Sequence, residues 1–287
     1  MSSSRLFIIC ATALAPCLWG TTYIVFTETL PVDHPLLVAA LRALPAGFLL
    51  LMVSPSWPTR DKLVPYFVLG LTNIGLFLAL LFIAAARLPG GVVAMLIAAQ
   101  PLFVAFLAIP LLRRLPHGGQ VLAAFAGIVG VGFLVSGSTQ NLDSLGIAAA
   151  LGAAASMALG TVLIERWGRV GTPLSVAAWQ LTIGGALLLP IALVVEGLPP
   201  MPTVLNAVGF VYLIGPGTAL AYWLWVRGIG QIGSDVAFLG LLSPLVAAVL
   251  GMAWLGEELS LVQALGAVLI LLSAAAGVIL SKQKKLP

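Results

Sequence analysis

The side chain with the most distinctive chemistry in this sequence is an arginine inside an apolar segment. Arg42 lies about seven residues, or about 10 Å of helix, from the nearer end of the segment 35–53. An unpaired charge in hydrocarbon is costly, so this guanidinium needs a defined partner. Two roles are open from the residues alone: Arg42 binds a carboxylate of a ligand, or it reaches outward and donates hydrogen bonds to loop carbonyl groups as a structural clamp.

Aromatic and polar side chains in other apolar segments predict an aromatic-lined cavity for an amphipathic or ring-bearing ligand. Asn73 and Phe77, for example, share one helix face at a spacing of four residues. An aromatic belt at the membrane interface is the alternative, and it accounts better for the tryptophans near segment ends, which are Trp57, Trp167, Trp225 and Trp254. The predicted ligand-binding residues are Trp19, Tyr23, Arg42, Asn73, Phe77, Gln100, Trp179, Tyr222 and Ser243.

Proline and glycine near the middle of apolar segments mark positions where a helix is interrupted. An interrupted helix exposes backbone carbonyl and amide groups toward a cavity, which is a common way to build a binding site in a membrane. Gln100-Pro101 and Ser243-Pro244 occupy equivalent places in two segments. A plain kink is the alternative interpretation of each proline. The predicted breaks and gating positions are Pro45, Pro101, Gly184, Pro216 and Pro244.

The composition places these segments in a lipid bilayer. Of the 287 residues, 61% are apolar, 13 are Lys or Arg and 9 are Asp or Glu. The mean hydropathy of +1.16 is far above that of soluble globular domains. The basic residues are scattered through short loops and form no stripe, which excludes a nucleic-acid-binding protein.

Charged, Pro-rich and Gly-rich breaks divide the chain into ten apolar segments of about 20 residues, the length that a hydrocarbon core of about 30 Å requires. The connections are short, so consecutive helices run antiparallel. We therefore predict an all-α integral membrane protein whose ten transmembrane helices span residues 6–27, 35–53, 65–86, 91–112, 119–136, 145–165, 173–195, 204–226, 235–254 and 261–281.

The two halves of the sequence repeat one another. The segment 35–42 matches 173–180 at an offset of 138, and this match pairs Arg42 with Gln180. Since each half holds five helices, an odd number, the second copy enters the membrane with the opposite polarity. The sequence therefore predicts two inverted five-helix repeats, 1–140 and 141–287, within one integrated domain, an architecture associated with alternating access.

The distribution of charge predicts the orientation. Of the twelve basic residues outside the segments, eleven fall on the side of the N-terminus and Arg87 alone falls on the other. Because short loops rich in Lys and Arg stay in the cytoplasm, we expect both termini to be cytoplasmic.

Catalytic and metal-binding chemistry is not indicated. The two histidines, His34 and His117, fall in loops on opposite sides of the membrane and so cannot share a catalytic or metal site. The sequence has no nucleophile-elbow, zinc-protease or P-loop motif. We therefore expect neither an enzyme nor a protein that holds a metal or cofactor.

Acidic side chains are missing from the middle of every segment. Glu28, Glu165, Asp235 and Glu257 all lie at or beyond segment ends. A pump for cationic drugs needs a buried carboxylate that exchanges protons with the drug, so the pattern favours a neutral, zwitterionic or carboxylate-bearing cargo. It also favours facilitated diffusion, with proton coupling through a boundary acid such as Glu28 as the alternative.

The chain resembles the EamA-type, ten-helix branch of the drug/metabolite transporter superfamily over essentially its whole length. The resemblance rests on the segment 18–22 (Leu-Trp-Gly-Thr-Thr), on Leu41-Arg42, and on the stretch from Leu242-Ser243-Pro244-Leu245 to the segment 263–266. It implies an exporter of small metabolites, and the chain is similar to the aromatic amino-acid exporters in particular.

We therefore expect an inner-membrane transporter that exports amino acids or similar amphipathic metabolites by alternating access through a central cavity. Its partners would be a small-molecule substrate and the lipid bilayer, and the protein would be a monomer, with a homodimer as the alternative. The competing functions are a proton-coupled drug exporter and a transporter of another metabolite such as a nucleoside or sugar. A membrane scaffold without transport and a lipid-handling protein also stay open.

Overall fold

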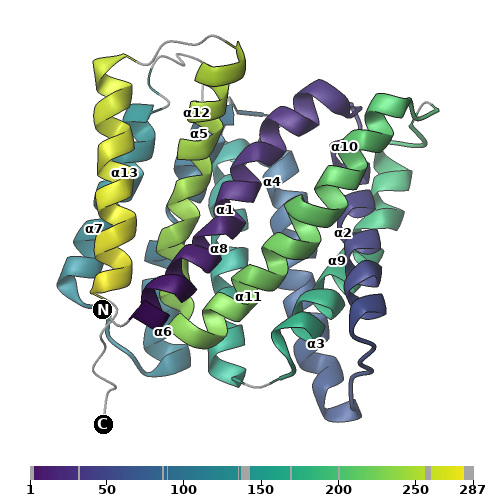
Figure 1. Cartoon of the computed structure of the whole chain (residues 1–287), viewed down its shortest axis with the longest axis horizontal. Helices are drawn as coiled ribbons and strands as arrows, with labels where there is room; N and C mark the ends of the chain where they lie inside the picture. Colours follow the sequence, from purple (N-terminus) through teal and green to yellow (C-terminus); the bar gives the residue numbers. More distant parts are fainter. Residues whose placement is uncertain are drawn as a thin grey trace.

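The computed structural model describes residues 3–31, 33–85, 87–88, 90–134, 136, 143–168, 170–199, 201–255 and 260–280. Every regular element within these ranges is a helix, and the helices run side by side in one bundle (Figure 1). Nine helical segments of the described chain are long and apolar enough to cross a membrane, and α7 adds a shorter apolar helix. The prediction of an all-helical membrane fold is confirmed.

The first half of the chain contains nine of the named elements, several of which join end to end. These are α1 (Ser3–Thr29), α2 (Pro35–Val53), η1 (Arg60–Lys62), α3 (Leu63–Gly70), η2 (Leu71–Leu76), α4 (Phe77–Ala85), α5 (Gly90–Ile97), α6 (Gln100–Leu112) and α7 (Gly118–Leu134).

The second half follows the same plan. Its elements are α8 (Ser144–Trp167), α9 (Pro173–Val195), α10 (Val204–Ile214), η3 (Gly215–Leu220), α11 (Ala221–Ile232), η4 (Ser234–Leu241), α12 (Leu242–Leu255) and α13 (Leu261–Ile279).

Helix starts are fixed by side chains that accept hydrogen bonds from free backbone N–H groups. Thr203 and Ser260 each form a capping box at the start of α10 and α13, with Asn206 and Gln263 as the reciprocal residues. The start of α2 has no cap of this kind from its own residues. There the Glu196 carboxylate, at the end of α9, accepts hydrogen bonds from the backbone N–H groups of Leu36 and Leu37 at 2.7 and 2.8 Å.

Two membrane-crossing helices contain a π-helical turn, a widened turn that is frequent at functional sites. The turn η3 contains Pro216, which has no N–H group and therefore cannot continue the α-helical hydrogen-bond ladder. The turn η2 contains no proline, so the sequence analysis missed it. The two turns lie in corresponding helices of the two halves, between α3 and α4 and between α10 and α11.

Two further crossings change helix type along their length. The helix pair α5 and α6 is interrupted at Ala98 and Ala99, directly before Gln100-Pro101. The crossing that contains Ser243-Pro244 begins as the 3-10 helix η4 and continues as α12. By contrast, α2 runs unbroken through Pro45 and α9 runs unbroken through Gly184. Neither residue marks a helix break in this structure, and a role in gating stays a prediction for both.

Helices α2 and α9 cross with their backbones in close contact. A Cβ atom added to Gly47 would lie 2.6 Å from the backbone nitrogen of Thr182, and one added to Gly185 would lie 2.6 Å from that of Leu44. Small residues at such crossings allow the two backbones to approach, which maximises packing where lipid supplies no hydrophobic driving force. The glycines of α2 and α9 therefore hold the two halves of the chain together.

Small residues also allow α7 and α13 to pack closely. Ser273 donates a hydrogen bond to the carbonyl oxygen of Ala123 at 2.6 Å, and a Cβ atom on Gly130 would lie 2.9 Å from the carbonyl oxygen of Gly266. The small-residue ridges of these helices are thus used in packing within one chain.

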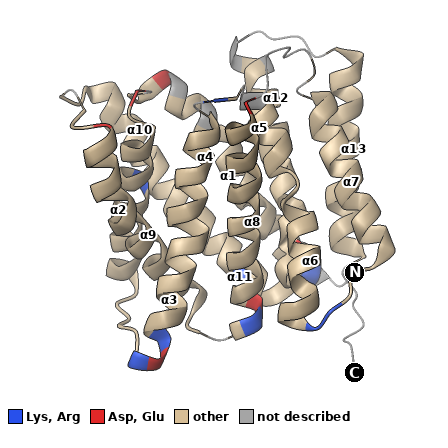
Figure 2. Ribbon diagram, turned by 180° about the vertical axis from the view of Figure 1, so that it is seen from behind, with Lys and Arg blue, Asp and Glu red and all other residues tan. Residues whose placement is uncertain are grey.

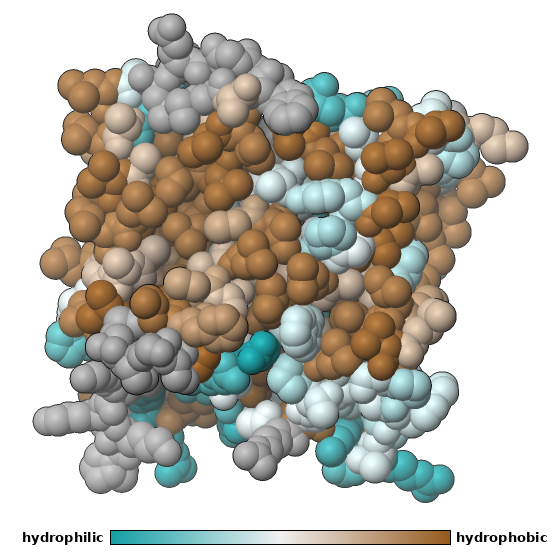
Figure 3. Space-filling view, viewed as in Figure 1, coloured by the Kyte–Doolittle hydropathy of each residue, from teal (hydrophilic) through white to brown (hydrophobic). Residues whose placement is uncertain are grey.

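The start of α1 and the end of α13 lie at the same side of the bundle, since the Arg5 guanidinium donates a hydrogen bond to the carbonyl oxygen of Val278 at 3.4 Å. We call this side the terminal face. Figure 2 shows blue basic residues gathered along it, beside α3, α11 and α6. Figure 3 shows an apolar surface across the middle of the molecule and hydrophilic residues toward the terminal face. The basic residues that the sequence analysis assigns to one side of the membrane therefore gather at one face of the structure.

The α2–α9 crossing predicts a specific sensitivity to added volume. Gly185→Ala would force a methyl group against the backbone of Leu44, and we expect it to destabilise the protein by about 1–3 kcal/mol. Gly230→Ala in α11 is the matched control, because no atom lies within 4 Å of its added Cβ atom. Unfolding of the purified variants by heat or denaturant measures both, and equal stability of the two variants would contradict the close crossing.

Candidate functional site

Arg42 extends from α2 to the π-helical turn η3. Its Nε atom donates a hydrogen bond to Thr218 Oγ1 at 3.0 Å, and Thr218 is buried. Tyr222 of α11 lies four residues after Thr218 in the same membrane crossing. None of the ion pairs in the described part of the chain involves Arg42. The terminal nitrogens of the guanidinium are therefore not matched by a carboxylate of the described residues.

Three aromatic rings of α1 and α11 pack together, and α11 directly follows the turn η3 that Arg42 contacts. The ring centroid of Trp19 in α1 lies 5.2 Å from that of Tyr222 and 5.1 Å from that of Trp225, both in α11. Trp225 is only 2% exposed, so assigning it to an interfacial belt was wrong. The reason is that α11 continues to Ile232, beyond the predicted end of this segment, which places Trp225 deep in the helix.

Gln100 and Ser243 border the same region. An added Cβ atom on Gly240 would have Gln100 Oε1 and Trp225 Cη2 as its nearest neighbours, at 3.8 and 3.9 Å. A Cβ atom on Gly20, the residue after Trp19, would lie 2.6 Å from the backbone carbonyl oxygen of Ser243. The structure therefore brings these predicted residues together from four crossings. We define the central cluster as Trp19, Arg42, Gln100, Thr218, Tyr222 and Trp225.

The central cluster is rich in hydrogen-bond donors. Trp19 Nε1, Gln100 Nε2 and Trp225 Nε1 are buried, and none of them has a hydrogen-bond partner among the described residues. Buried polar groups are almost always paired in folded proteins, because an unpaired one keeps its full desolvation penalty. Together with the Arg42 guanidinium, these groups suit a ligand that accepts hydrogen bonds.

Asn73 makes a separate pair. Its Nδ2 atom, in η2, donates a hydrogen bond to Gln180 Oε1 of α9 at 3.0 Å, and both residues are buried. This contact parallels the one between Arg42 and Thr218, because in each case a helix of one half reaches the π-helical turn of the other. Ser156 of α8 donates a hydrogen bond to the carbonyl oxygen of Thr72, also in η2, at 2.8 Å. Asn73 is thus occupied in packing between helices.

The remaining predicted residues lie apart from the central cluster. Trp179 Nε1 donates a hydrogen bond to the carbonyl oxygen of Ser56 at 2.8 Å, and its ring packs beside Trp57 and Tyr66 near the terminal face. Phe77 is a partly buried core residue at the start of α4. The backbone of Tyr23 belongs to α1, whereas its side chain lies outside the described part of the structure.

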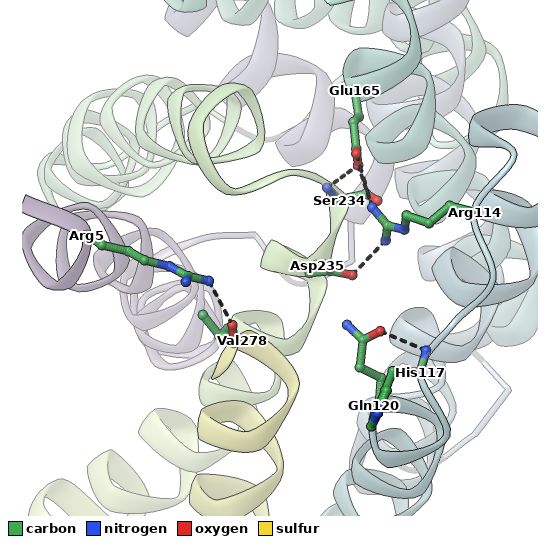
Figure 4. Close-up of polar contacts among 8 residues, drawn as sticks. All are labelled: Arg5, Arg114, His117, Gln120, Glu165, Ser234, Asp235 and Val278. Carbon is green, nitrogen blue, oxygen red and sulfur yellow. Dashed lines mark hydrogen bonds and ion pairs between the residues drawn. The ribbon is translucent and has the colours of Figure 1, made fainter. Parts of the chain in front are cut away.

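A buried ionic cluster lies at the terminal face (Figure 4). Arg114 Nη2 contacts Asp235 Oδ1 at 2.8 Å, and Arg114 Nη1 contacts Glu165 Oε1 at 3.1 Å. The backbone N–H group of Ser234 donates a hydrogen bond to Glu165 Oε2 at 2.5 Å. Because Arg114 follows α6, Glu165 ends α8 and Asp235 begins η4, the cluster joins three helices.

The sequence analysis counted Arg114 among the loop charges, whereas the structure buries it. The cause is the backbone conformation at the end of α6. Arg113 adopts a left-handed conformation with φ of 51°, and the backbone N–H group of Arg114 then bonds back to the carbonyl oxygen of Ala108 at 3.2 Å. This turn directs Arg114 inward and leaves Arg113 exposed.

An apolar groove of about 400 Å³ lies between η2, α4, α6 and α8. Aliphatic and aromatic side chains make up most of its lining, and Thr72 and Ser156 are its polar members. Among the described residues, no group of three or more His, Cys, Asp or Glu side chains is placed to hold a metal ion.

The model of the EamA-like transporter family matches this chain twice, over residues 6–136 and 144–278. The protein belongs to the EamA-like transporter family. The two matched segments fall within the two halves that the sequence predicts. Membership makes the chain a multi-pass membrane protein of a transporter family.

Named relatives of this EamA-like transporter cover most of its length. The chain is 45% identical to protein PecM of Dickeya dadantii (strain 3937) over 260 residues, which is 89% of this chain and 87% of the relative. It is 30% identical to a probable amino-acid metabolite efflux pump of Salmonella typhimurium (strain LT2) over 280 residues, 90% of each chain. A solved crystal structure shares the fold, with a TM-score of 0.81 at 20% identity over 96% of this chain and 97% of the other.

Sequence reasoning missed several residues of the transporter's polar interior. Thr218 stands four residues before Tyr222, and Trp225 stands three residues after it. Helical spacing therefore places both on the same helix face as Tyr222, which is a signal that the sequence contains. No sequence signal paired Arg114 with Glu165 and Asp235, which are far apart in the chain.

The ionic cluster predicts a large difference between two adjacent arginines. Arg114→Gln leaves two carboxylates without their shared cation, and we expect a loss of about 3–5 kcal/mol of unfolding free energy. Arg113→Gln removes the same charge from an exposed side chain and should change stability little. Urea unfolding of the detergent-solubilised variants compares them, and equal losses would contradict a structural role of the cluster.

Proposed function

We propose that this EamA-like transporter exports small amphipathic metabolites that carry a carboxylate, with amino acids as the main class, across the bacterial inner membrane. The cargo crosses by alternating access through a central cavity between two inverted five-helix halves. The observation that carries the proposal is the Arg42 guanidinium, which lies inside a membrane-crossing helix with Thr218 as its hydrogen-bond partner and no ion-pair partner in the described chain.

A carboxylate is the natural complement of such a guanidinium. Arginine presents several N–H donors in a planar fork, and a carboxylate accepts two of them at once. The Nε atom is already used by Thr218, which fixes the side chain and leaves the other donors for a ligand. Because a charge in a low-dielectric site interacts strongly, one such contact supplies much of the affinity for the cargo.

The aromatic rings that follow the turn contacted by Arg42 suit the apolar part of the cargo. Binding sites for small molecules are mostly apolar, with a few polar groups that fix the orientation of the ligand. Trp19 and Tyr222 offer ring faces and edges, and Tyr222 stands four residues after Thr218, the partner of Arg42. The name of the Salmonella relative, a probable amino-acid metabolite efflux pump, supports the same class of cargo.

Cationic cargo is disfavoured by the same arrangement. A drug exporter that binds organic cations needs a carboxylate near its cargo. Asp235, which is buried, and Glu165, which is partly buried, are both paired with Arg114 at the terminal face. The central cluster itself holds donors and aromatic rings.

The charges at the terminal face and the irregular turns of the helices bear on the orientation of the transporter and on its movement. The basic residues gathered at the terminal face support a cytoplasmic location for both termini. The π-helical turns η2 and η3, one in each half, are the positions where a membrane crossing can bend. Helices α2 and α9 pack tightly against each other where the two halves meet.

The small-residue ridges of α7 and α13 are used for packing within one chain, which supports a monomer.

The proposal predicts the effect of neutralising Arg42. Arg42→Gln introduces the residue type that occupies the equivalent position of the other half, where Gln180 stands. The fold should therefore tolerate the substitution. Loss of a charged hydrogen-bonding group should weaken binding and transport of phenylalanine and threonine by about 10- to 100-fold. Proteoliposome uptake, with and without a proton gradient, measures this loss. A nucleoside and a cationic drug complete the set of substrates.

Arg87→Gln is the matched control, since it removes the same charge from an exposed side chain and should leave transport unchanged. Saturable amino-acid transport that ignores the proton gradient supports a facilitated exporter. Wild-type transport of amino acids by Arg42→Gln, or drug transport that requires the gradient, would contradict the proposal.

A further inference from the structure

The structure assigns a second polar subsite to this transporter, formed by Trp225 and Gln100, that receives a hydrogen-bond-accepting oxygen at the end of the cargo remote from its carboxylate. This inference rests on the proposed function, in which Arg42 binds the carboxylate. It narrows the cargo to carboxylates with an apolar or aromatic middle and a hydroxyl or carbonyl oxygen at the far end.

The first argument is the number of donors left without a partner in one place. Trp225 is 2% exposed and Gln100 is 6% exposed, so neither Trp225 Nε1 nor Gln100 Nε2 is available to bulk solvent. Neither atom has a partner within the described chain, and the same holds for Trp19 Nε1 on the adjoining ring. Three buried donors without an acceptor thus belong to neighbouring side chains of α1, α6 and α11, and a group of unpaired buried donors is rare unless a ligand completes it.

The second argument is space. Helix glycines of this protein at other contacts, such as Gly20 and Gly185, have neighbouring atoms within 3 Å of an added Cβ atom. Gly240 in η4 is different, because the nearest atoms are Gln100 Oε1 at 3.8 Å and Trp225 Cη2 at 3.9 Å. The missing side chain of Gly240 therefore leaves room for a methyl-sized group beside the Gln100 amide and the Trp225 ring.

The third argument is the order of the groups. Arg42 bonds to Thr218, four residues before Tyr222 in the same crossing, the Tyr222 ring packs on Trp19, and the Trp19 ring packs on Trp225. Aromatic surface therefore separates the guanidinium from the second group of donors. A cargo that matches this order has a carboxylate, then a ring or apolar chain, and then an acceptor oxygen.

Tyrosine and phenylalanine are the probes, because they differ by one hydroxyl oxygen at the far end of the ring. Isothermal titration of the full-length protein in nanodiscs measures the dissociation constant of each. We expect tyrosine to bind about 3- to 10-fold more tightly than phenylalanine, the worth of one neutral hydrogen bond. Trp225→Phe keeps a ring and removes the N–H group, so it should abolish this preference for tyrosine over phenylalanine.

Two glycine variants test the space. Gly240→Ala adds a methyl group at ordinary contact distance from its neighbours, so it should fold normally while it fills the room beside Gln100 and Trp225. It should weaken tyrosine more than phenylalanine. Gly230→Ala, in α11 with open space around it, is the matched control and should change neither affinity.

The outcomes separate the subsite from the proposed function. If Arg42→Gln weakens both amino acids equally and the wild type binds tyrosine and phenylalanine with equal affinity, the proposed function stands and the subsite is overturned. If neither amino acid binds the wild type, the proposed function fails, and the subsite, which rests on it, is overturned as well.

Discussion

A polar group inside a hydrocarbon layer must find its partner within the protein, and this constraint explains most of the structure. Backbone groups meet it by forming helices, and each place where a helix departs from regular geometry exposes groups that a side chain or ligand must satisfy. The π-helical turns η2 and η3 are such places, and each receives a polar side chain from a helix of the other half: Gln180 contacts Asn73, and Arg42 contacts Thr218. Packing between the halves and the candidate binding site therefore have one physical origin.

Much of the fold could be predicted from the sequence because hydrophobic length, loop charge and repetition each leave a local signal. The predicted segments correspond to the observed crossings, and the interruption before Gln100 follows from a proline in its neighbourhood. The π-helical turn η2 could not be predicted, because Leu71–Leu76 contains no proline and its geometry depends on contacts with α8 and α9. The end of α11 was placed too early, since Arg227 suggests a membrane boundary that the helix in fact passes.

The candidate site was predictable in composition and less so in arrangement. Trp19 packs on Tyr222, and Arg42 bonds to Thr218, four residues before Tyr222, so these predicted residues meet in one region. Trp179 and Asn73 have the same sequence properties and lie elsewhere, because their polar groups are satisfied by Ser56 and Gln180, contacts over more than 100 positions that a single sequence does not reveal. Arg114 shows the same limit, since one left-handed residue before it decides whether its charge meets solvent or two carboxylates.

The two interhelical polar pairs differ in a way that concerns the direction of transport. Asn73 and Gln180 are both neutral amides whose hydrogen bond closes their contact, whereas Arg42 and Thr218 form a contact with donors left over. Under the proposed arrangement of two inverted halves, identical copies would offer a cargo the same contacts from either side of the membrane. Arg42 in one half and Gln180 at the equivalent position of the other remove that equivalence, so the proposed transport would use one half to hold the cargo and the other to pack against it.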